Sequence, residues 1–459
     1  MSEASKHSLK LDPAKSSIPV IDKCAIIPIS AFVYTSIYVP LISFASPSAT
    51  TLQNVMESHL ENRIFWPVMA ASSVVLAMRN RSRFGKLPPH IICLLVYLAF
   101  AGASVLWALR PETSFNRFTQ EVMVVTSIVL PAMLAVDTMR GLFLCFSFGL
   151  ILNVLLAPPY AAGNYGGYFL DKNALGQFTA IAFLLALHEM LYPGLRRALG
   201  TAVVVIAGMV LVVGGSKTSL GFAFFAPFLA GFTLMTRKTM RVSPMIVPLI
   251  IIMLGVFFRD RVSWYLFHDP TFSLRTVIWD FVIYEIGRSP LLGWGYQSFW
   301  LVPGSPSFVD ASGWISVMPE AHNGYLDAIL EMGYVGLACL VIFIMTTLHA
   351  IGPLADRDPA RAWLMLSLVI FVIFHNLLES SWMHGYNLLW LVFMIVAAQV
   401  ARYSQPFPLR RSTYGSRIRR PNSPGLSRAA QRSLGAEGHA AMPRESRRGP
   451  AENMRRGHS

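Results

Sequence analysis

Residues 321–348 read AHNGYLDAILEMGYVGLACLVIFIMTTL, a polar opening that passes into one long apolar run. The run is near the roughly 20 residues that an α-helix needs to cross a bilayer. The pair His322-Asn323 stands where this helix begins, and Gly333 and Gly336 form a Gly-x-x-Gly step further along it. The stretch predicts a membrane helix that carries polar groups at one membrane surface.

Apolar runs of similar length recur along the whole chain. Of its 459 residues, 54% are hydrophobic and only 14% are charged, and the mean hydropathy is +0.51. A soluble protein carries nearer a quarter charged residues. The runs are continuous, whereas the strands of a membrane β-barrel alternate over segments of about ten residues. The sequence therefore predicts an all-α polytopic membrane protein.

We expect about twelve membrane helices, and their number and orientation follow from hydropathy and charge. Most of the 38 Lys and Arg residues fall in inner segments if the N-terminus lies inside, as the positive-inside rule requires. Both termini are then cytoplasmic, and one long loop, residues 259–322, lies outside. The expected spans are 24–45, 62–78, 89–108, 121–136, 140–158, 174–192, 198–214, 219–235, 244–258, 323–348, 360–377 and 387–401.

The chain divides into three parts on this reading. Residues 1–23 form a cytoplasmic N-terminal segment, residues 24–402 form the transmembrane domain with its outer loop, and residues 403–459 form a basic tail. The tail is rich in Arg, Ser, Pro and Gly and cannot bury a core, so we expect it to be disordered. The net charge of +14 sits mostly in this tail and the inner loops, so it does not indicate nucleic-acid binding.

Three predicted helices begin at the outer surface behind polar or basic side chains. Helix N-termini favour anions, and arginine binds phosphate oxygens through a planar fork. The pattern predicts a binding site for a diphosphate. Each basic side chain considered alone, however, is more commonly an anchor at the membrane interface. The candidate groups are Asp171-Lys172-Asn173, Ser216-Lys217-Thr218-Ser219, His322-Asn323, and Arg275 and Arg288 in the outer loop.

Two carboxylates, Asp327 and Glu331, lie one helical turn apart in the first half of the tenth span. Carboxylates within a membrane helix are costly and are usually paired or functional. They can orient His322, pair with a basic loop residue or form a proton relay, and a relay would favour a transporter. We see no cluster with metal-ligand spacing and no nucleotide fingerprint, so no metal site and no cofactor is expected.

The motifs resemble a known family. The pattern His-Asn, nine residues, Gly-x-x-Gly is similar to the signature of the bacterial O-antigen ligase and polymerase superfamily. Residues 272–279 (FSLRTVIW) and 289–300 (SPLLGWGYQSFW) resemble its arginine and Pro-Leu-Leu-Gly elements. Residues 216–220 (SKTSL) are most similar to the exopolysaccharide-production branch, and the resemblance covers roughly residues 105–400.

Two departures from the family pattern bear on activity. Leu274 stands where the family often has glycine, and Lys217 stands where ligases often carry arginine. Lysine still binds phosphate, but as a point charge rather than a fork. These departures favour a polymerase or exopolysaccharide role over a strict ligase.

The resemblance implies a metal-independent membrane glycosyltransferase in the bacterial inner membrane. Its donor would be a glycan on undecaprenyl diphosphate, and its acceptor another lipid-linked glycan for a polymerase or lipid A-core for a ligase. Whether a chain-length regulator also binds stays open. His322 would be the base or orienter for the acceptor hydroxyl, and Arg275 would stabilise the leaving diphosphate. The substrate-binding candidates are Lys217, Thr218, Lys172, Asn173, Asn323, Arg288 and Tyr296.

Two other classes remain as alternatives. A transporter of lipid-linked sugars would show two related halves and helices interrupted near the membrane midplane. The sequence shows no internal repeat, and its polar residues cluster at one surface. The other alternative is a purely structural subunit of an envelope complex.

Overall fold

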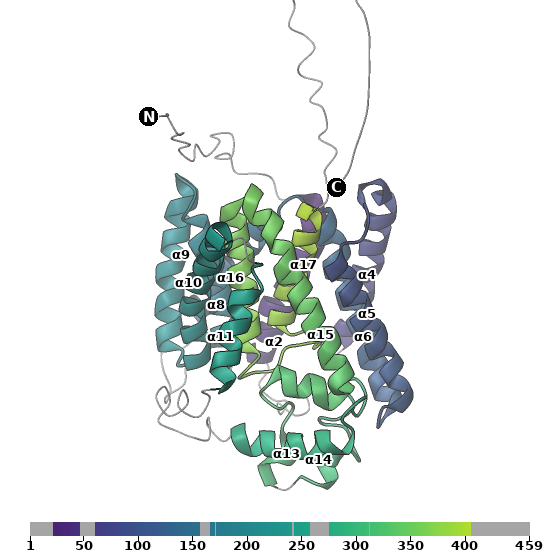
Figure 1. The fold of residues 1–459 in the computed structure, drawn as a ribbon. Helices are drawn as coiled ribbons and strands as arrows, with labels where there is room; N and C mark the ends of the chain where they lie inside the picture. Colours follow the sequence, from purple (N-terminus) through teal and green to yellow (C-terminus); the bar gives the residue numbers. More distant parts are fainter. Residues whose placement is uncertain are drawn as a thin grey trace, which may run out of the picture. The chain divides into compact units, whose positions relative to one another are not determined.

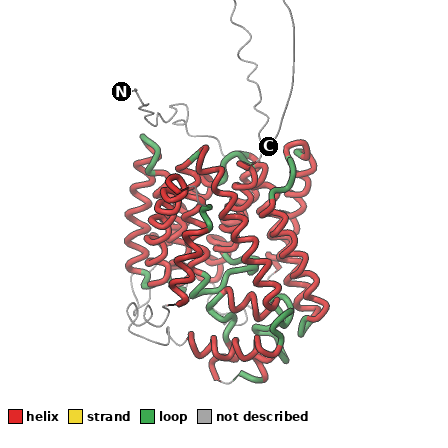
Figure 2. The backbone as a smooth tube through the Cα atoms, viewed as in Figure 1, coloured by secondary structure: helices red, strands yellow, loops and turns green. Residues whose placement is uncertain are grey.

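The computed structural model describes residues 22–45, 60–156, 166–169, 171–240, 243–257, 275–311 and 313–404. Every regular element in these residues is a helix (Figures 1 and 2). The predicted all-α architecture is confirmed. The predicted disordered tail lies outside the described residues except for its first two, which end the last helix.

The longer helices follow the predicted spans closely, and two short helices, α13 and α14, lie in the outer loop. The helices are α1 (Ile26–Val33), α2 (Val39–Ala45), α4 (Leu60–Arg79), α5 (Pro89–Ser104), α6 (Pro111–Leu134), α7 (Met139–Leu156), α8 (Lys172–Glu189), α9 (Leu195–Val213), α10 (Lys217–Met240), α11 (Ile246–Phe257), α13 (Arg275–Arg288), α14 (Pro306–Val309), α15 (Gly324–Arg357), α16 (Pro359–His375) and α17 (Leu388–Ser404).

The largest difference from the predicted boundaries is at α6. It begins at Pro111, ten residues before the expected start of its span at residue 121. Proline suits the first turn of a helix, and Glu112 beside it suits the positive helix end. The first turns of α6 are polar, so hydropathy alone did not include them.

Within the described residues, seven helical segments are long and apolar enough to cross a membrane. This makes the chain a multi-pass membrane protein. α16 and α17 are apolar but shorter, so among the described residues a count of twelve crossings stays a prediction. The seven segments are Lys23–Ala45, Pro89–Trp107, Pro111–Leu134, Met139–Leu156, Leu195–Val213, Lys217–Met240 and Gly324–Arg357.

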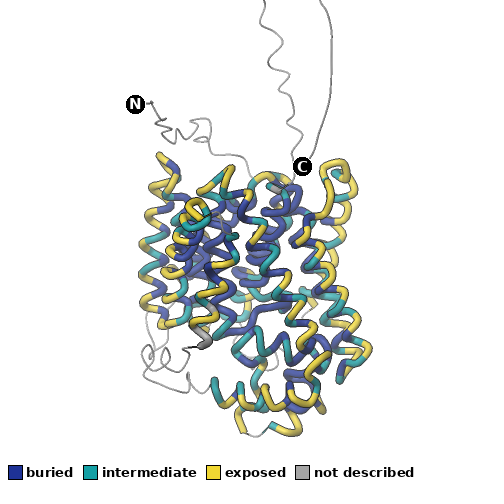
Figure 3. Tube along the Cα trace, in the orientation of Figure 1, coloured by how far each residue is buried: buried dark blue, intermediate teal, exposed yellow. Residues whose placement is uncertain are grey.

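α16 and α17 form the centre of the bundle (Figure 3). Every side chain from Leu389 to Ala401 in α17 is buried, and the helix contacts α5, α6, α8, α15 and α16. A helix that is apolar on all sides is buried on all sides. The helices around it expose large apolar side chains such as Met209 and Phe228, as expected of surfaces that face lipid. The loop between α16 and α17, residues 376–387, is therefore held by the two central helices.

The described part of the outer loop has a small hydrophobic core of its own. α13 and α14 lie at one end of the bundle near the start of α15 (Figure 1), and α13 contacts α15. Ile278, Val282 and Ile286 form one face of α13 and pack against Phe299 and Trp300. The polar loop predicted from the sequence thus contains a packed unit that fixes the position of α13.

α15 is interrupted at Gly333, which has φ +65° and ψ −172°. The backbone of the segment Pro290–Gly295 fills the break: Gly295 N–H donates to Glu331 C=O at 2.8 Å, and Tyr334 N–H donates to Pro290 C=O at 2.9 Å. A Cβ atom at residue 333 would lie 2.1 Å from the carbonyl oxygen of Leu291. Only glycine meets both the backbone angle and this close approach. The Gly-x-x-Gly step is therefore a docking point for the outer loop.

Candidate active site

The carboxylate of Glu379, in the loop between α16 and α17, joins three of the predicted motifs. Arg275 donates from Nη2 to Oε1 of Glu379 at 2.5 Å, and Asn173 donates from Nδ2 to the same oxygen at 3.1 Å. Nδ1 of His322 lies 3.0 Å from Oε2 of Glu379 and 3.1 Å from Oε1 of Glu320. We refer to these five residues as the Glu379 cluster.

The three residues Asn173, Arg275 and His322, which pair with Glu379, all lie at or near the start of a helix. Asn173 is the second residue of α8, whose N-cap Asp171 accepts from the N–H of Ala174 at 2.9 Å. Arg275 is the first residue of α13, and His322 comes two residues before α15. The three helix N-termini bring partial positive charge toward one buried carboxylate.

The His-Asn pair has a structural explanation in the start of α15. Asn323 is the N-cap, and its Oδ1 accepts from the N–H groups of Tyr325 and Leu326 at 3.1 and 3.2 Å. His322 has φ +51°, a left-handed conformation that is uncommon for residues other than glycine. Such strained backbone persists only where the surroundings hold it in place. Asn323 shapes the helix end, and His322 holds a partly exposed imidazole beside Glu379.

Gly324 fastens the start of α15 to the loop that carries Glu379. Its N–H donates to the carbonyls of Asn376 at 2.9 Å and of Glu379 at 3.1 Å. A Cβ atom at this position would lie 2.2 Å from Oδ1 of Asn376. The close approach sets the distance between His322 and Glu379, and it excludes a side chain at residue 324.

The cluster carries separated charges at neutral pH. Burial by itself lowers the pKa of His322, but hydrogen bonds to Glu320 and Glu379 raise it to about 10. Burial raises the pKa of Glu379, but His322 and Arg275 bring it below its ordinary value. Glu379 is 6% exposed, whereas Arg275 and His322 are 18% and 27% exposed. Two partly exposed cations and the partly exposed carboxylate of Glu320 therefore lie around a buried anion.

The Ser-Lys-Thr-Ser element reaches the cluster through its serines. The hydroxyl of Ser216 lies 3.5 Å from Oδ1 of Asn173 and 3.1 Å from the hydroxyl of Ser219. Ser219 in turn contacts Nε2 of the buried His375 at 3.2 Å. These contacts place exposed Lys217 and half-buried Thr218 at the start of α10, next to the cluster, and Lys172 adjoins Asn173 in the chain.

Arg288 and Tyr296 are not brought to the cluster. Arg288 is the last residue of α13, about 20 Å along the helix from Arg275. It donates to Asp310 at 2.7 Å and to Glu285 at 3.2 Å. Tyr296 is fully buried, and its hydroxyl donates to the carbonyl of Met383 at 2.6 Å. A substrate role for either residue stays a prediction.

The sequence analysis did not select Glu379 or Glu320. Glu379 is the one acidic residue in the stretch between the last two predicted spans, residues 378–386. That isolation was the available signal, because a carboxylate beside a membrane core is usually paired. Glu320 stands two residues before His322 and has no distinguishing pattern in the sequence.

The cluster also has the geometry of a small metal site. One ligand atom each from Glu320, His322 and Glu379 lies within 4.8 Å of the others. The guanidinium of Arg275, however, already lies 2.5 Å from Glu379 and would repel a divalent ion. The prediction that no metal binds therefore stays open to a direct test.

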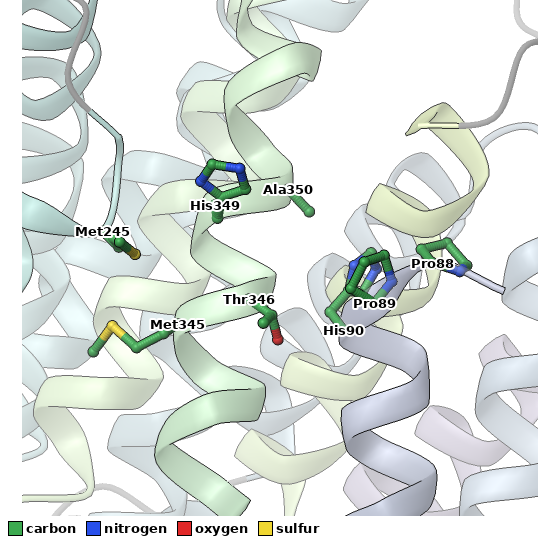
Figure 4. Close-up of a pocket in the computed structure, with 8 residues that line it drawn as sticks. All are labelled: Pro88, Pro89, His90, Met245, Met345, Thr346, His349 and Ala350. Carbon is green, nitrogen blue, oxygen red and sulfur yellow. The ribbon is translucent and has the colours of Figure 1, made fainter.

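An apolar cavity of about 480 Å³ lies elsewhere in the bundle (Figure 4). Its lining includes His90 near the start of α5 and Thr346 and His349 in α15. Thr346 is about 30 Å along α15 from Gly324. The cavity is therefore separate from the Glu379 cluster.

Comparison with known proteins connects this geometry to a family. Residues 202–341 match the family described as O-Antigen ligase, a range that includes Lys217, Arg275 and His322. The chain is similar to a Rickettsia felis protein named as a polysaccharide ligase, with 23% identity over 63% of this chain and 76% of the relative. It is also similar to the exopolysaccharide production protein ExoQ of Rhizobium meliloti, with 23% identity over 58% of this chain and 67% of the relative.

A third relative matches over a shorter stretch. It is a Rickettsia conorii protein named as a polysaccharide ligase, with 27% identity over 27% of this chain. The match spans 32% of that relative's own length. Residues 202–341 are thus similar to the O-Antigen ligase family, in agreement with the resemblance of the motifs to the bacterial O-antigen ligase and polymerase superfamily.

Proposed function

We propose that this protein is a membrane glycosyltransferase that polymerises oligosaccharide repeats carried on undecaprenyl diphosphate. The reaction would take place at the periplasmic face of the bacterial inner membrane. The observation that carries the proposal is the Glu379 cluster, in which Arg275 and His322 lie over one buried carboxylate. The names of the relatives support a role in polysaccharide processing. The resemblance of residues 216–220 to the exopolysaccharide-production branch favours polymerisation.

Arg275 and Lys217 would bind the diphosphate of the donor. Nε of Arg275 is buried and has no hydrogen-bond partner within the described residues, while Nη2 is held by Glu379. Lys217 begins α10, whose N-terminal N–H groups favour anions. As the bond between the anomeric carbon and the diphosphate breaks, negative charge develops on the leaving oxygen. Fixed cations at that position stabilise the charge without rearrangement.

His322 would orient the oxygen of the acceptor hydroxyl. With a pKa of about 10, it is an imidazolium in the free site and donates from both ring nitrogens. Nδ1 is directed at Glu320 and Glu379, which leaves Nε2 for a substrate oxygen. The acceptor oxygen then attacks the anomeric carbon from the side opposite the diphosphate, its proton leaves to solvent, and the configuration inverts.

A cellular comparison tests the polymerase proposal. The size of the lipid-linked glycan is measured in cells with the native protein, without it, with His322→Ala and with His349→Ala. His349 is the matched control, because it lies on the same helix but borders the separate cavity. We expect single repeats to accumulate without the protein and with His322→Ala, and long chains to persist with His349→Ala.

The same experiment separates the alternatives. Long chains that stay on the lipid carrier and never reach lipid A-core would identify a ligase, as the names of the Rickettsia relatives favour. Unchanged glycan length and attachment in all strains would contradict both enzyme roles and favour a transporter. The structure offers that alternative little support, because the break in α15 at Gly333 lies near the helix start and is filled by protein backbone.

A further inference from the structure

A second buried carboxylate, that of Asp327, forms hydrogen bonds with residues adjacent in the chain to His322 and Glu379. Asp327, in the first turn of α15, is 3% exposed. Its oxygens accept from Nε1 of Trp300 at 2.7 Å and from the N–H of Ala321 at 3.1 and 3.2 Å. The hydroxyl of Ser380 also donates to it. Within the described residues, all the hydrogen-bond partners of the Asp327 carboxylate are donors, as a buried carboxylate requires.

The three donors belong to three separate segments that meet at the site. Trp300 lies in the outer loop after α13, Ala321 immediately precedes His322, and Ser380 immediately follows Glu379. The carbonyl of Ala321 is held as well, because Nε1 of Trp279, one turn after Arg275, donates to it at 3.0 Å. The peptide before His322 is thus fixed on both sides.

The start of α15 does not need Asp327 as a cap. Asn323 already accepts from the first free N–H groups of the helix. The left-handed backbone of His322, by contrast, must be held by its neighbours. Asp327 accepts hydrogen bonds from Ala321, which precedes His322, and from Ser380, which follows Glu379. Its position therefore suits the task of setting the distance between these two loops.

We propose that Asp327 is a positioning residue. It holds His322 and Glu379 at a fixed distance from each other and acts on the reaction only through them. The proposal rests on the function proposed for the Glu379 cluster. Two of the three donors to Asp327, the indole N–H of Trp300 and the backbone N–H of Ala321, do not exchange protons on the timescale of catalysis, so these contacts serve to hold the carboxylate rather than to transfer a proton. Hydrogen bonds to a buried carboxylate are strong, and their loss leaves the other partners unpaired.

The test uses the purified full-length protein and the variants Asp327→Asn, Ser380→Ala and Trp300→Phe. The matched control is Asp280→Asn, which changes an exposed aspartate on α13. The first readout needs no substrate: carbethoxylation of His322 by diethylpyrocarbonate at pH 7, followed by mass spectrometry of its peptide. Only neutral imidazole reacts, and His322 faces Glu320 and Glu379, with Arg275 paired to Glu379. Exposed His349 is the internal standard.

We expect His322 to be protected in the native protein and in Asp280→Asn. In Asp327→Asn the loops separate, the ion pairs of His322 weaken, and its reactivity should rise about tenfold for each unit by which its pKa falls. Ser380→Ala and Trp300→Phe each remove one donor to Asp327 and should show smaller increases. Combined with Asp327→Asn they should add little, since the pairs share one interaction.

The second readout is glycan elongation from lipid-linked repeats. We expect turnover by Asp327→Asn to fall about 100-fold, the loss that follows from misplacing a reacting group by about 1 Å. The KM for the donor should stay within twofold, because Asp327 does not contact Arg275 or Lys217.

Two outcomes would overturn the proposal. Native protection of His322 in Asp327→Asn, with native turnover, would show that Asp327 does not position the cluster. The same holds if Asp327→Asn fails to assemble while Ser380→Ala and Trp300→Phe leave protection and turnover unchanged. Failure of the proposed function is recognised separately, because full elongation by His322→Ala would contradict the function and leave the protection measurement intact.

Discussion

At the scale of single residues, the site depends on one buried carboxylate and the charges around it. Glu379 alone would be costly in a buried loop, but Arg275, His322 and Asn173 satisfy both of its oxygens. The side chains of Arg275, His322 and Glu320 are partly exposed, whereas Glu379 is buried. Arg275 and His322 therefore present part of their surface beside the carboxylate of Glu320.

The charge of His322 should appear in the pH dependence of stability. Its pKa in the folded protein, about 10, lies above the ordinary value near 6.5. The stabilisation from its ion pairs is therefore fully present below about pH 6.5 and is lost as the pH rises through about 10. We expect the thermal unfolding midpoint of the native protein to fall over this range. In Glu320→Gln the pKa of His322 is lower, so the decrease should be smaller.

The pH dependence of the rate separates two roles of His322. If the imidazolium orients the acceptor, turnover should be flat from pH 7 to 9 and fall as the proton is lost near pH 10. If neutral His322 acts as a base, turnover should rise about tenfold per pH unit up to the pKa. A rising profile would contradict the orienting role that we propose.

The side chains of the Glu379 cluster also determine whether turnover depends on a metal ion. We expect chelation by EDTA to leave turnover unchanged, because Arg275 and His322 supply the positive charge at the site. The control is the same assay with added Mg²⁺ or Mn²⁺. Loss of activity with chelator and recovery with either ion would show that Glu320, His322 and Glu379 form a metal site instead.

At the scale of elements, the outer loop is attached to α15 through the break at Gly333. The backbone of residues 290–295 forms hydrogen bonds on both sides of the break. This attachment, together with the packing of α13 against Phe299 and Trp300, sets where Arg275 stands relative to His322. The glycine step and the arginine element, separate in the sequence, are one structural unit.

Gly333→Ala should therefore destabilise the protein. The added Cβ would meet the carbonyl of Leu291 at 2.1 Å in a backbone conformation that alanine disfavours. We expect a cost of about 1–3 kcal/mol, seen as a lower unfolding midpoint, together with loss of glycan elongation. The control is Gly208→Ala in α9, where no atom lies within 4 Å of the new Cβ. Equal midpoints for the two variants would contradict this account of the break.

At the scale of the whole molecule, the central helices place the chemistry at one end of the bundle. α16 and α17 are almost entirely buried, so the loop between them has a fixed position. Irregular backbone of this kind is tolerated beside a membrane where protein surrounds it. The starts of α8, α10 and α15 all contribute to the site at that end.

Cysteine labelling tests the orientation of the bundle. We expect Asp280→Cys, on the exposed side of α13, to react with a membrane-impermeant maleimide added to the periplasmic side. Ser82→Cys, in the connection between α4 and α5, should react only after the inner membrane is opened. The unsubstituted protein is the control, because Cys24 and Cys145 are buried and Cys93 and Cys339 are half-buried. Labelling of both positions from one side would contradict the predicted topology.

The sequence by itself determined the helices and the polar groups at their starts. Apolar run length depends on local composition, so all twelve predicted spans coincide with helices, and polar groups at helix starts are visible as motifs. Only the tertiary structure decided that Asn173, Arg275 and His322 meet at Glu379, that Asp327 lies behind them, and that Arg288 stands about 20 Å away. The physical reason is that convergence depends on how buried helices pack against one another, which no local pattern records.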